Sequence, residues 1–308
     1  MLASHFGKYL KDKDISISIP LREDALNKTI EDAPYVLTNY QADKDNIIFY
    51  DMEHGYPTEY VDHLGPYGDP MSMACYPIIW SYQIENYKIF KEIGRESDFK
   101  FVPLRYTDYY DLQGYTIKDV SEFAYMIQFE GKLMESRECE YLPVESQSTL
   151  RNRIVTNLLS KLRTLDGKLS DDIIEICVSN THNMPERCRI KQISRYCLDI
   201  PRLDCPQTIN NFRIWENILL NKQTIVVDPS NITMDYFGDL IIKLHDASRF
   251  EYDIELIAFN NFAPLDIRER FKEMTDSDEA YDNYRIRIIR EFSDRTGIMV
   301  PDSVLKLD

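Results

Sequence analysis

The chain has 308 residues, of which 44% are hydrophobic and 29% charged, and its formal net charge is −16. These proportions are typical of a globular protein and exclude a disordered or fibrous one. The negative charge disfavours direct binding to nucleic acid, because the protein and the phosphates repel each other. No window approaches the roughly 20 apolar residues of a membrane span, and Met1 is not followed by the apolar segment of a signal peptide. We therefore expect a soluble, cytoplasmic protein without a membrane partner.

The charge is unevenly distributed along the chain. Residues 1–145 carry a net charge of −12, residues 146–229 carry +3, and residues 230–308 carry −7. The first change of sign coincides with a polar stretch, Glu138–Gln147. The sequence thus predicts an acidic N-terminal α+β region over residues 1–145 and a helix-rich C-terminal α+β region over residues 146–308, with a single domain as the alternative.

The predicted elements alternate between helix and strand without a regular βαβ order. In the N-terminal region, period-two patterns predict strands at Ser16–Leu21, Asn46–Asp51 and Phe99–Leu104. Apolar residues at helical spacing predict a helix over Pro77–Ile93 that stops at Gly94, whereas Phe123–Met134 fits either a hairpin or a helix end.

The C-terminal region opens on the clearest helical pattern of the chain, Ser148–Leu165, with Ser148 as its N-cap. We expect further helices at Thr208–Leu220, Thr233–His245 and Asp278–Arg295, and strands at Thr224–Val227 and Tyr252–Phe259. The mixed order predicts the α+β class, with mixed helices and short strands and no regular βαβ repeat.

The densest group of polar side chains follows the strand predicted at Asn46–Asp51. Asp51, His54, Asp62 and His63 are residue types that bind divalent metals or act as acid and base. One interpretation is a metal-dependent hydrolase that uses these residues. The alternative is an ordinary solvated loop in an acidic protein, which is the interpretation we favour.

Cysteines form a second group of possible metal ligands. Five soft ligands lie within 29 residues, namely Cys177, His182, Cys188, Cys197 and Cys205. No Cys-x-x-Cys pair is present, and the spacings are irregular. We expect reduced, partly buried thiols rather than a zinc site, and we expect no cofactor.

Two surfaces are candidates for protein contacts. Tyrosine supplies a large contact area at a small entropic cost, and a loop-like segment concentrates this residue at Tyr106, Tyr109, Tyr110 and Tyr115. A basic run in the positively charged middle of the chain comprises Arg187, Arg189, Lys191 and Arg195. The partners we expect are other protein subunits, either copies of this chain or neighbours in an assembly.

No catalytic signature stands out: the chain has no Gly-Lys-Ser/Thr phosphate loop and no Gly-x-Ser-x-Gly elbow. Few glycines and many Ile, Asn, Asp and Tyr residues are typical of AT-rich genomes, including those of many phages and viruses. The favoured prediction is a non-enzymatic structural subunit of a large assembly, such as a connector or minor capsid or tail protein located in the virion. The metal-dependent hydrolase and an acidic module that binds a basic protein are the alternatives.

Overall fold

The computed structural model describes residues 36–38, 47–51, 78–116, 123, 125–130, 153–157, 176–179, 183–200, 211–228, 234–246, 248–259 and 266–306. Helices and short strands are mixed, which confirms the predicted α+β content. The chain forms two compact units. Unit 1 comprises residues 1–107 and 273–308, and unit 2 comprises residues 108–272. The division predicted after residue 145 therefore falls inside unit 2, and the last helix of the chain returns to unit 1.

Unit 1 contains a parallel sheet whose described strands follow the order of the chain. The order is β1–β2–β3–β4, with β1 at Val36–Thr38, β2 at Ile47–Asp51, β3 at Ile78–Ser81 and β4 at Phe99–Phe101. A 3-10 turn, η3 (Ile84–Asn86), leads into α4 (Tyr87–Glu92) between β3 and β4. The helix stops at Gly94 as the sequence predicts, since this residue has a φ of 72°.

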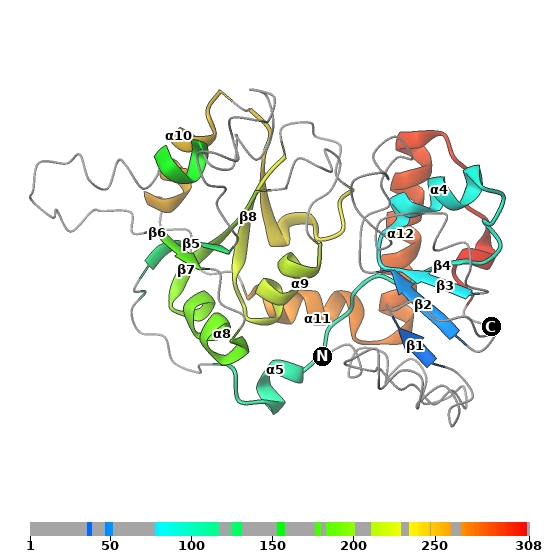
Figure 1. Ribbon diagram of the computed structural model, residues 1–308, viewed down its shortest axis with the longest axis horizontal. Coiled ribbons are helices and arrows are strands. Elements are labelled where there is room, and N and C mark those ends of the chain that lie inside the picture. Colours follow the sequence, from blue (N-terminus) through cyan, green and yellow to red (C-terminus); the bar gives the residue numbers. More distant parts are fainter. Residues whose placement is uncertain are drawn as a thin grey trace, which may run out of the picture. The chain divides into compact units, whose positions relative to one another are not determined.

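The long helix α12 (Asp278–Thr296) belongs to unit 1 (Figure 1). Ser277 caps its start by accepting a hydrogen bond from the amide of Ala280, and Gly297 ends it in the left-handed conformation. Its buried stripe includes Arg285, whose guanidinium donates to the carbonyl oxygens of Phe101 and Leu305. Through Arg285, α12 therefore contacts both the end of β4 and the residue that follows the 3-10 turn η5 (Asp302–Val304).

Unit 2 contains a five-stranded parallel sheet in the order β6–β5–β7–β8–β9. These strands are β5 (Tyr125–Glu130), β6 (Ile176–Ser179), β7 (Ser194–Asp199), β8 (Gln223–Val227) and β9 (Ile241–Leu244). The chain first steps from β5 to β6 and then reverses, continuing through β7, β8 and β9 on the other side of β5 (Figure 1). This is the 2-1-3-4-5 order of a doubly wound fold, and it places a topological switch point between β5 and β7.

The two faces of the unit 2 sheet differ in polarity. One face is an apolar core, in which Ile127, Leu198 and Ile225 pack with the helical residues 153–157 and with α10 (Phe250–Phe259). The other face is polar, because Gln128, Glu130, Cys197, Asp199 and Thr224 alternate with the core residues along their strands.

Two helices of nine residues each supply the contacts to the polar face. These are α8 (Met184–Gln192), which precedes β7, and α9 (Asn211–Leu219), which precedes β8. Near them, α5 (Tyr109–Leu112) opens unit 2, and an ion pair between Asp111 and Arg268 connects it to α11 (Ile267–Thr275).

Three predicted elements were assigned the wrong type. The helix predicted over Pro77–Ile93 begins as strand β3, and the helix predicted over Thr233–His245 is η4 (Gly238–Leu240) followed by strand β9. The strand predicted at Tyr252–Phe259 is helix α10. The strand predicted at Ser16–Leu21 and most of Ser148–Leu165 lie outside the described residues.

The described helices were also compared with the requirements of a membrane span. Within the described ranges, none of them combines the length and the apolar character needed to cross a bilayer.

Candidate functional site

The carboxyl edge of the unit 2 sheet carries a polar residue at or directly after the end of each strand. Glu130 ends β5, Ser179 ends β6 and Asp199 ends β7, whereas Asp228 and His245 directly follow β8 and β9. Helices α8 and α9 each run back toward a following parallel strand, so both begin at this same edge. Polar side chains and helix N-termini therefore meet at one side of unit 2.

Glu130 and Asp199 are neighbours across the switch point. Phe129 pairs with Leu198, so the next residue along each strand is one of the two acids, and both lie on the polar face. Adjacent strands are about 4.8 Å apart, which places two carboxylates side by side. In open parallel sheets, ligands bind in the crevice at such a point.

Glu130 belongs to a group of buried polar side chains that we name the charged cluster: Tyr110, Glu130, Arg187, Lys191 and Glu216. Lys191 lies on α8, is fully buried, and forms ion pairs with both Glu130 (2.9 Å) and Glu216. Arg187, one turn earlier on the helix, contacts the same two glutamates. The Tyr110 hydroxyl donates to Glu216 Oε1 over 2.6 Å. The cluster thereby links α8, α9 and the end of β5.

The charged cluster favours the ionised forms of Glu216 and Lys191 and the neutral form of Tyr110. Burial alone would raise the pKa of Glu216, but the neighbouring Lys191 and Arg187 outweigh it and lower this pKa to about 2. Burial likewise opposes the charge of Lys191, yet Glu216 and Glu130 raise its pKa above the ordinary value. The pKa of Tyr110 is raised by burial and by the charge of Glu216. The four charges cancel, so the cluster is a closed, neutral group.

Asp199 is held differently from the glutamates of the charged cluster. Its side chain is 1% exposed, and its Oδ1 accepts one hydrogen bond from Arg213 Nη1 at 3.3 Å. Its Oδ2 is buried and finds no hydrogen-bond partner in the described part of the chain. Arg213 lies in the first turn of α9, a turn that contains no acidic residue. A carboxylate with spare acceptor capacity therefore lies beside a helix start that favours negative charge.

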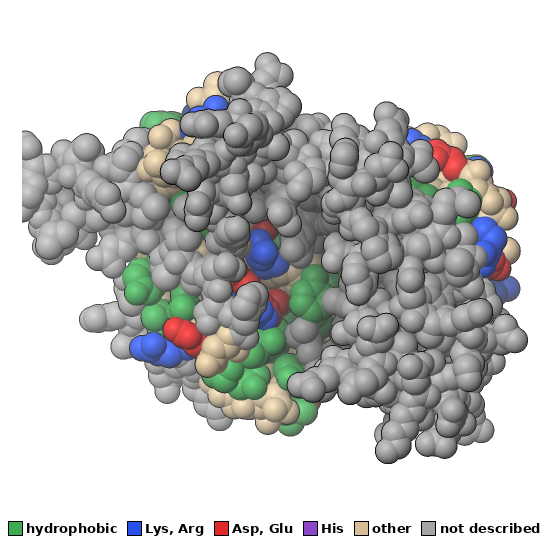
Figure 2. All heavy atoms as spheres, in the orientation of Figure 1, with side chains coloured by type: hydrophobic (Ala, Val, Ile, Leu, Met, Phe, Trp, Pro, Cys, Tyr) green, Lys and Arg blue, Asp and Glu red, His purple; other side chains and the backbone are tan. Residues whose placement is uncertain are grey.

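The space-filling view shows how this part of unit 2 looks from outside. Basic and acidic side chains lie next to one another among hydrophobic ones over helices α8 and α9 (Figure 2).

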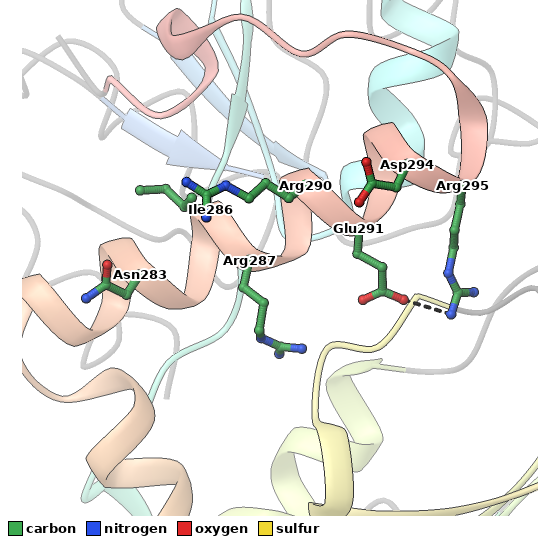
Figure 3. Close-up of a pocket in the computed structure, with 7 residues that line it drawn as sticks. All are labelled: Asn283, Ile286, Arg287, Arg290, Glu291, Asp294 and Arg295. Carbon is green, nitrogen blue, oxygen red and sulfur yellow. Dashed lines mark ion pairs between the residues drawn. The ribbon is translucent and has the colours of Figure 1, made fainter.

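A hollow lies along α12 of unit 1, with a volume of about 420 Å³. Figure 3 shows that its described lining comes from one helix, with Arg287, Glu291 and Arg295 on the same side of α12. Glu291 and Arg295 form an ion pair of 2.8 Å, and Arg287 lies over the ring of Tyr284. Because exposed pairs of this kind are common on helix surfaces, the carboxyl edge of unit 2 is the stronger candidate.

The structure separates the tyrosines that were predicted to form an interface. Tyr106 and Tyr110 are buried, whereas Tyr109 and Tyr115 are partly exposed. The rings of Tyr109, Tyr110 and Tyr115 contact one another within unit 2. Burial corrects the expectation for Tyr106 and Tyr110, and an interface role for Tyr109 and Tyr115 stays a prediction.

The predicted basic run divides in the same way. Arg187 and Lys191 are used inside the charged cluster, so they do not form a free basic surface. Arg189 is exposed, and Arg195 lies over the ring of Tyr196. A partner surface at Arg189 and Arg195 stays a prediction.

The predicted metal ligands lie mostly outside the described residues. Asp51 ends β2, whereas His54, Asp62 and His63 belong to the undescribed part of the chain. Of the other candidate zinc ligands, Cys177 lies in β6, and His182 and Cys205 are not described. Among the described residues there is no group of three or more His, Cys, Asp or Glu that could hold a metal ion.

Cys188 and Cys197 have an environment that suits packing and not chemistry. Both are buried free thiols, and burial raises the pKa of each to about 12. Thiols with such a pKa are protonated at neutral pH, so they are poor nucleophiles and poor metal ligands in this form.

Glu130, Asp199, Arg213 and Glu216 were not singled out from the sequence. The signal that could have found the first two is an apolar run that ends in an acid, as in Met126–Glu130 and Tyr196–Asp199. No local pattern reveals Glu216, because its partners lie on β5 and α8.

The chain was compared with known proteins. No family model and no curated protein matches the sequence. Similar solved structures include the crystal structure of TarM, with 11% identity, a TM-score of 0.46, and coverage of 91% of this chain and 57% of that one. They also include accessory secretory protein 1, 2 and 3 of Streptococcus pneumoniae, with 10% identity and a TM-score of 0.37. That match covers 95% of this chain and 53% of the other one. A third is the Glycosylation Associate Protein (Gap123) complex of Streptococcus agalactiae, with 13% identity and a TM-score of 0.33. That match covers 95% of this chain and 55% of the other one.

This chain spans little more than half the length of each of those structures. The prediction of a viral or phage structural protein, located in the virion, is wrong on these comparisons, since the organisms named are bacteria and the proteins named are secretory or glycosylation components. The error has a plain cause: residue composition reflects the genome and says nothing of the fold. The two alternatives, metal-dependent hydrolase and acidic binding module, gain no support either.

Two of the three structures contain several proteins together. Which proteins those would be for this chain stays a prediction.

Proposed function

We propose that this chain binds a nucleotide sugar at the carboxyl edge of unit 2 and takes part in glycosyl transfer together with other proteins. The observation that carries the proposal is the reversal of strand order between β5 and β7, with Glu130 and Asp199 at the two adjacent strand ends. In doubly wound sheets, nucleotides bind in the crevice at this point, where helix N-termini face the phosphates.

The chemistry of the edge supports a ligand that has both phosphate and hydroxyl groups. The start of α9 has no acidic residue in its first turn and carries Arg213, which suits a phosphate. The first turn of α8 already contains Glu186 and is capped by Asn183, so it is the poorer phosphate site of the two. Asp199, at the end of the strand that leads toward α9, offers a carboxylate oxygen to hydroxyl groups.

Fold alone does not determine the group that is transferred. The name of one similar structure, Glycosylation Associate Protein, decides which ligands are tested first. We would titrate the full chain with UDP-, GDP- and ADP-sugars by calorimetry, with and without Mg²⁺, and locate binding by hydrogen exchange. Protection should appear at the ends of β5 and β7 and at the start of α9, while α10 on the opposite face stays unchanged.

A matched pair of variants sharpens this test. Arg213→Gln removes the basic group from the start of α9, and Arg249→Gln removes an exposed arginine that pairs with Asp253 on α10. We expect the first change to weaken binding of the nucleotide sugar about tenfold or more, as for loss of a charged hydrogen bond, and the second to leave it unchanged. Absence of binding at millimolar ligand, or protection confined to another surface, would refute the proposal.

A further inference from the structure

One oxygen of the Asp199 carboxylate, Oδ2, has no hydrogen-bond partner among the residues that the structure describes. The carboxylate is buried, and its single bond to Arg213 is long at 3.3 Å. Buried polar groups are nearly always paired, because an unpaired one loses its bonds to water without compensation. Glu216, on the same face of the sheet, is paired by contrast with Tyr110, Arg187 and Lys191. Asp199 Oδ2 can thus accept a hydrogen bond from a ligand.

The charges around Asp199 decide which kind of donor fits. Three carboxylates, those of Glu130, Asp199 and Glu216, face three basic groups on α8 and α9. Arg213 therefore already neutralises Asp199, and what its Oδ2 lacks is a hydrogen-bond donor and not a further positive charge. Hydroxyl groups donate hydrogen bonds without adding charge.

We propose that Asp199 is a specificity-determining residue that accepts hydrogen bonds from a vicinal diol of the ligand. A carboxylate has two oxygens and accepts from two neighbouring hydroxyls, the geometry that a ribose or a sugar ring presents. This inference rests on the proposed function, since it names the part of the nucleotide sugar to which Asp199 forms hydrogen bonds. Both the ribose and the transferred sugar carry such a diol, and the ligands of the test distinguish them.

The test measures the affinity of the full chain for matched ligands by calorimetry. A nucleotide sugar should bind about tenfold or more tightly than its 2′-deoxyribose counterpart, because the deoxy ligand leaves the buried carboxylate unpaired. If the ribose makes no difference, the nucleoside diphosphate without its sugar is compared with the complete ligand. A tenfold preference for the complete ligand, abolished in Asp199→Asn, assigns the diol to the sugar ring and supports the inference.

Asp199→Asn keeps the shape of the side chain and removes its charge, so the preference should collapse to about onefold. Asp253→Asn is the matched control, because Asp253 also pairs with one arginine but lies on α10. If Asp199→Asn fails to fold, the ratio between ribose and deoxyribose ligands in the wild-type chain still decides.

Three results would overturn the inference, and they differ in what they say of the proposed function. Equal affinities for all matched ligands, in wild type and in Asp199→Asn, contradict the diol contact and leave nucleotide binding standing. Binding that disappears when Mg²⁺ is chelated would assign Asp199 to a cation instead. Absence of binding for every nucleotide contradicts the proposed function as well.

Discussion

The charged cluster makes a sharp prediction about the stability of unit 2. In Glu216→Gln, Lys191 and Arg187 lose one of their two carboxylate partners, while the hydroxyl of Tyr110 keeps an acceptor. The pKa of Glu216 is lowered from 4.5 to about 2, and at about 1.4 kcal/mol for each pKa unit this amounts to roughly 3 kcal/mol. Removing one partner of a buried ion pair costs a similar amount, about 3–5 kcal/mol.

The direction of this pKa shift determines how the stabilising contribution of Glu216 depends on pH. The pKa of Glu216 is lower in the folded than in the unfolded state, so its stabilising contribution is present in full above pH 4.5 and is lost as the pH falls toward 2. The difference between wild type and Glu216→Gln should therefore be constant from pH 7 to pH 5 and shrink below pH 4.5.

Urea unfolding monitored by tryptophan fluorescence measures this directly. The chain has two tryptophans, Trp80 in unit 1 and Trp215 in unit 2, both buried. A Trp80→Phe background leaves Trp215, next to Glu216, as the reporter of unit 2. The urea midpoint should fall by roughly 1–3 M, given the slopes usual for small domains.

Two further variants distinguish the loss of a buried charge from the loss of an exposed one. Asp253→Asn removes an exposed ion pair with Arg249 and should cost less than about 1 kcal/mol. In Glu216→Gln the buried ammonium of Lys191 lacks its Glu216 partner, and Lys191→Met removes that ammonium. The double variant should therefore be more stable than the sum of the two single effects implies. A Glu216→Gln protein within about 0.5 kcal/mol of wild type at pH 7 would refute the reasoning, because a buried pair would then be worth no more than an exposed one.

Other predictions follow from single buried groups. Burial lowers the pKa of Lys222 to about 8, so the folded state opposes its charge. In urea unfolding, the stability of wild type relative to Lys222→Met should therefore rise between pH 8 and 10.5, a difference from which the opposite effect of the buried cysteines cancels. Cys188 and Cys197, with pKa values of about 12, should react with iodoacetamide at pH 8 only after the protein unfolds. Peptide mass spectrometry measures this labelling, and labelling of either cysteine in the native state would contradict its burial. Arg285→Met removes the hydrogen bonds that Arg285 donates to two carbonyl oxygens and should cost unit 1 about 2 kcal/mol or more. Arg290→Met on the exposed side of the same helix should cost less than about 0.5 kcal/mol, and equal effects, with Trp80 as reporter, would contradict the role of Arg285.

The sequence predicts those elements whose signals are local. The strand at Asn46–Asp51 and the helix at Asp278–Arg295 agree with β2 and α12, since apolar spacing and a Ser277 cap with Gly297 after the end are enough to specify them. Ile78–Ser81 was predicted as helix because a short apolar run looks alike in a buried strand and a buried helix.

Long-range features were not predictable from local pattern. Glu130 and Asp199 meet only because β5 and β7 pair in parallel, and the sheet order is decided by packing over the whole unit. The return of α12 to unit 1 is likewise a long-range contact, through which Arg285 reaches Phe101. A change of net charge along the sequence reports on the surface, so the domain division after residue 145 stays a prediction.

The most direct test of the account is a crystal structure of the chain with a bound nucleotide sugar. We predict density for the ligand at the carboxyl edge of unit 2, with phosphate groups at the start of α9 beside Arg213 and a diol within hydrogen-bond distance of Asp199. A ligand found instead along α12, or at the amino edge of the sheet, would contradict the assignment of the switch point as the functional site.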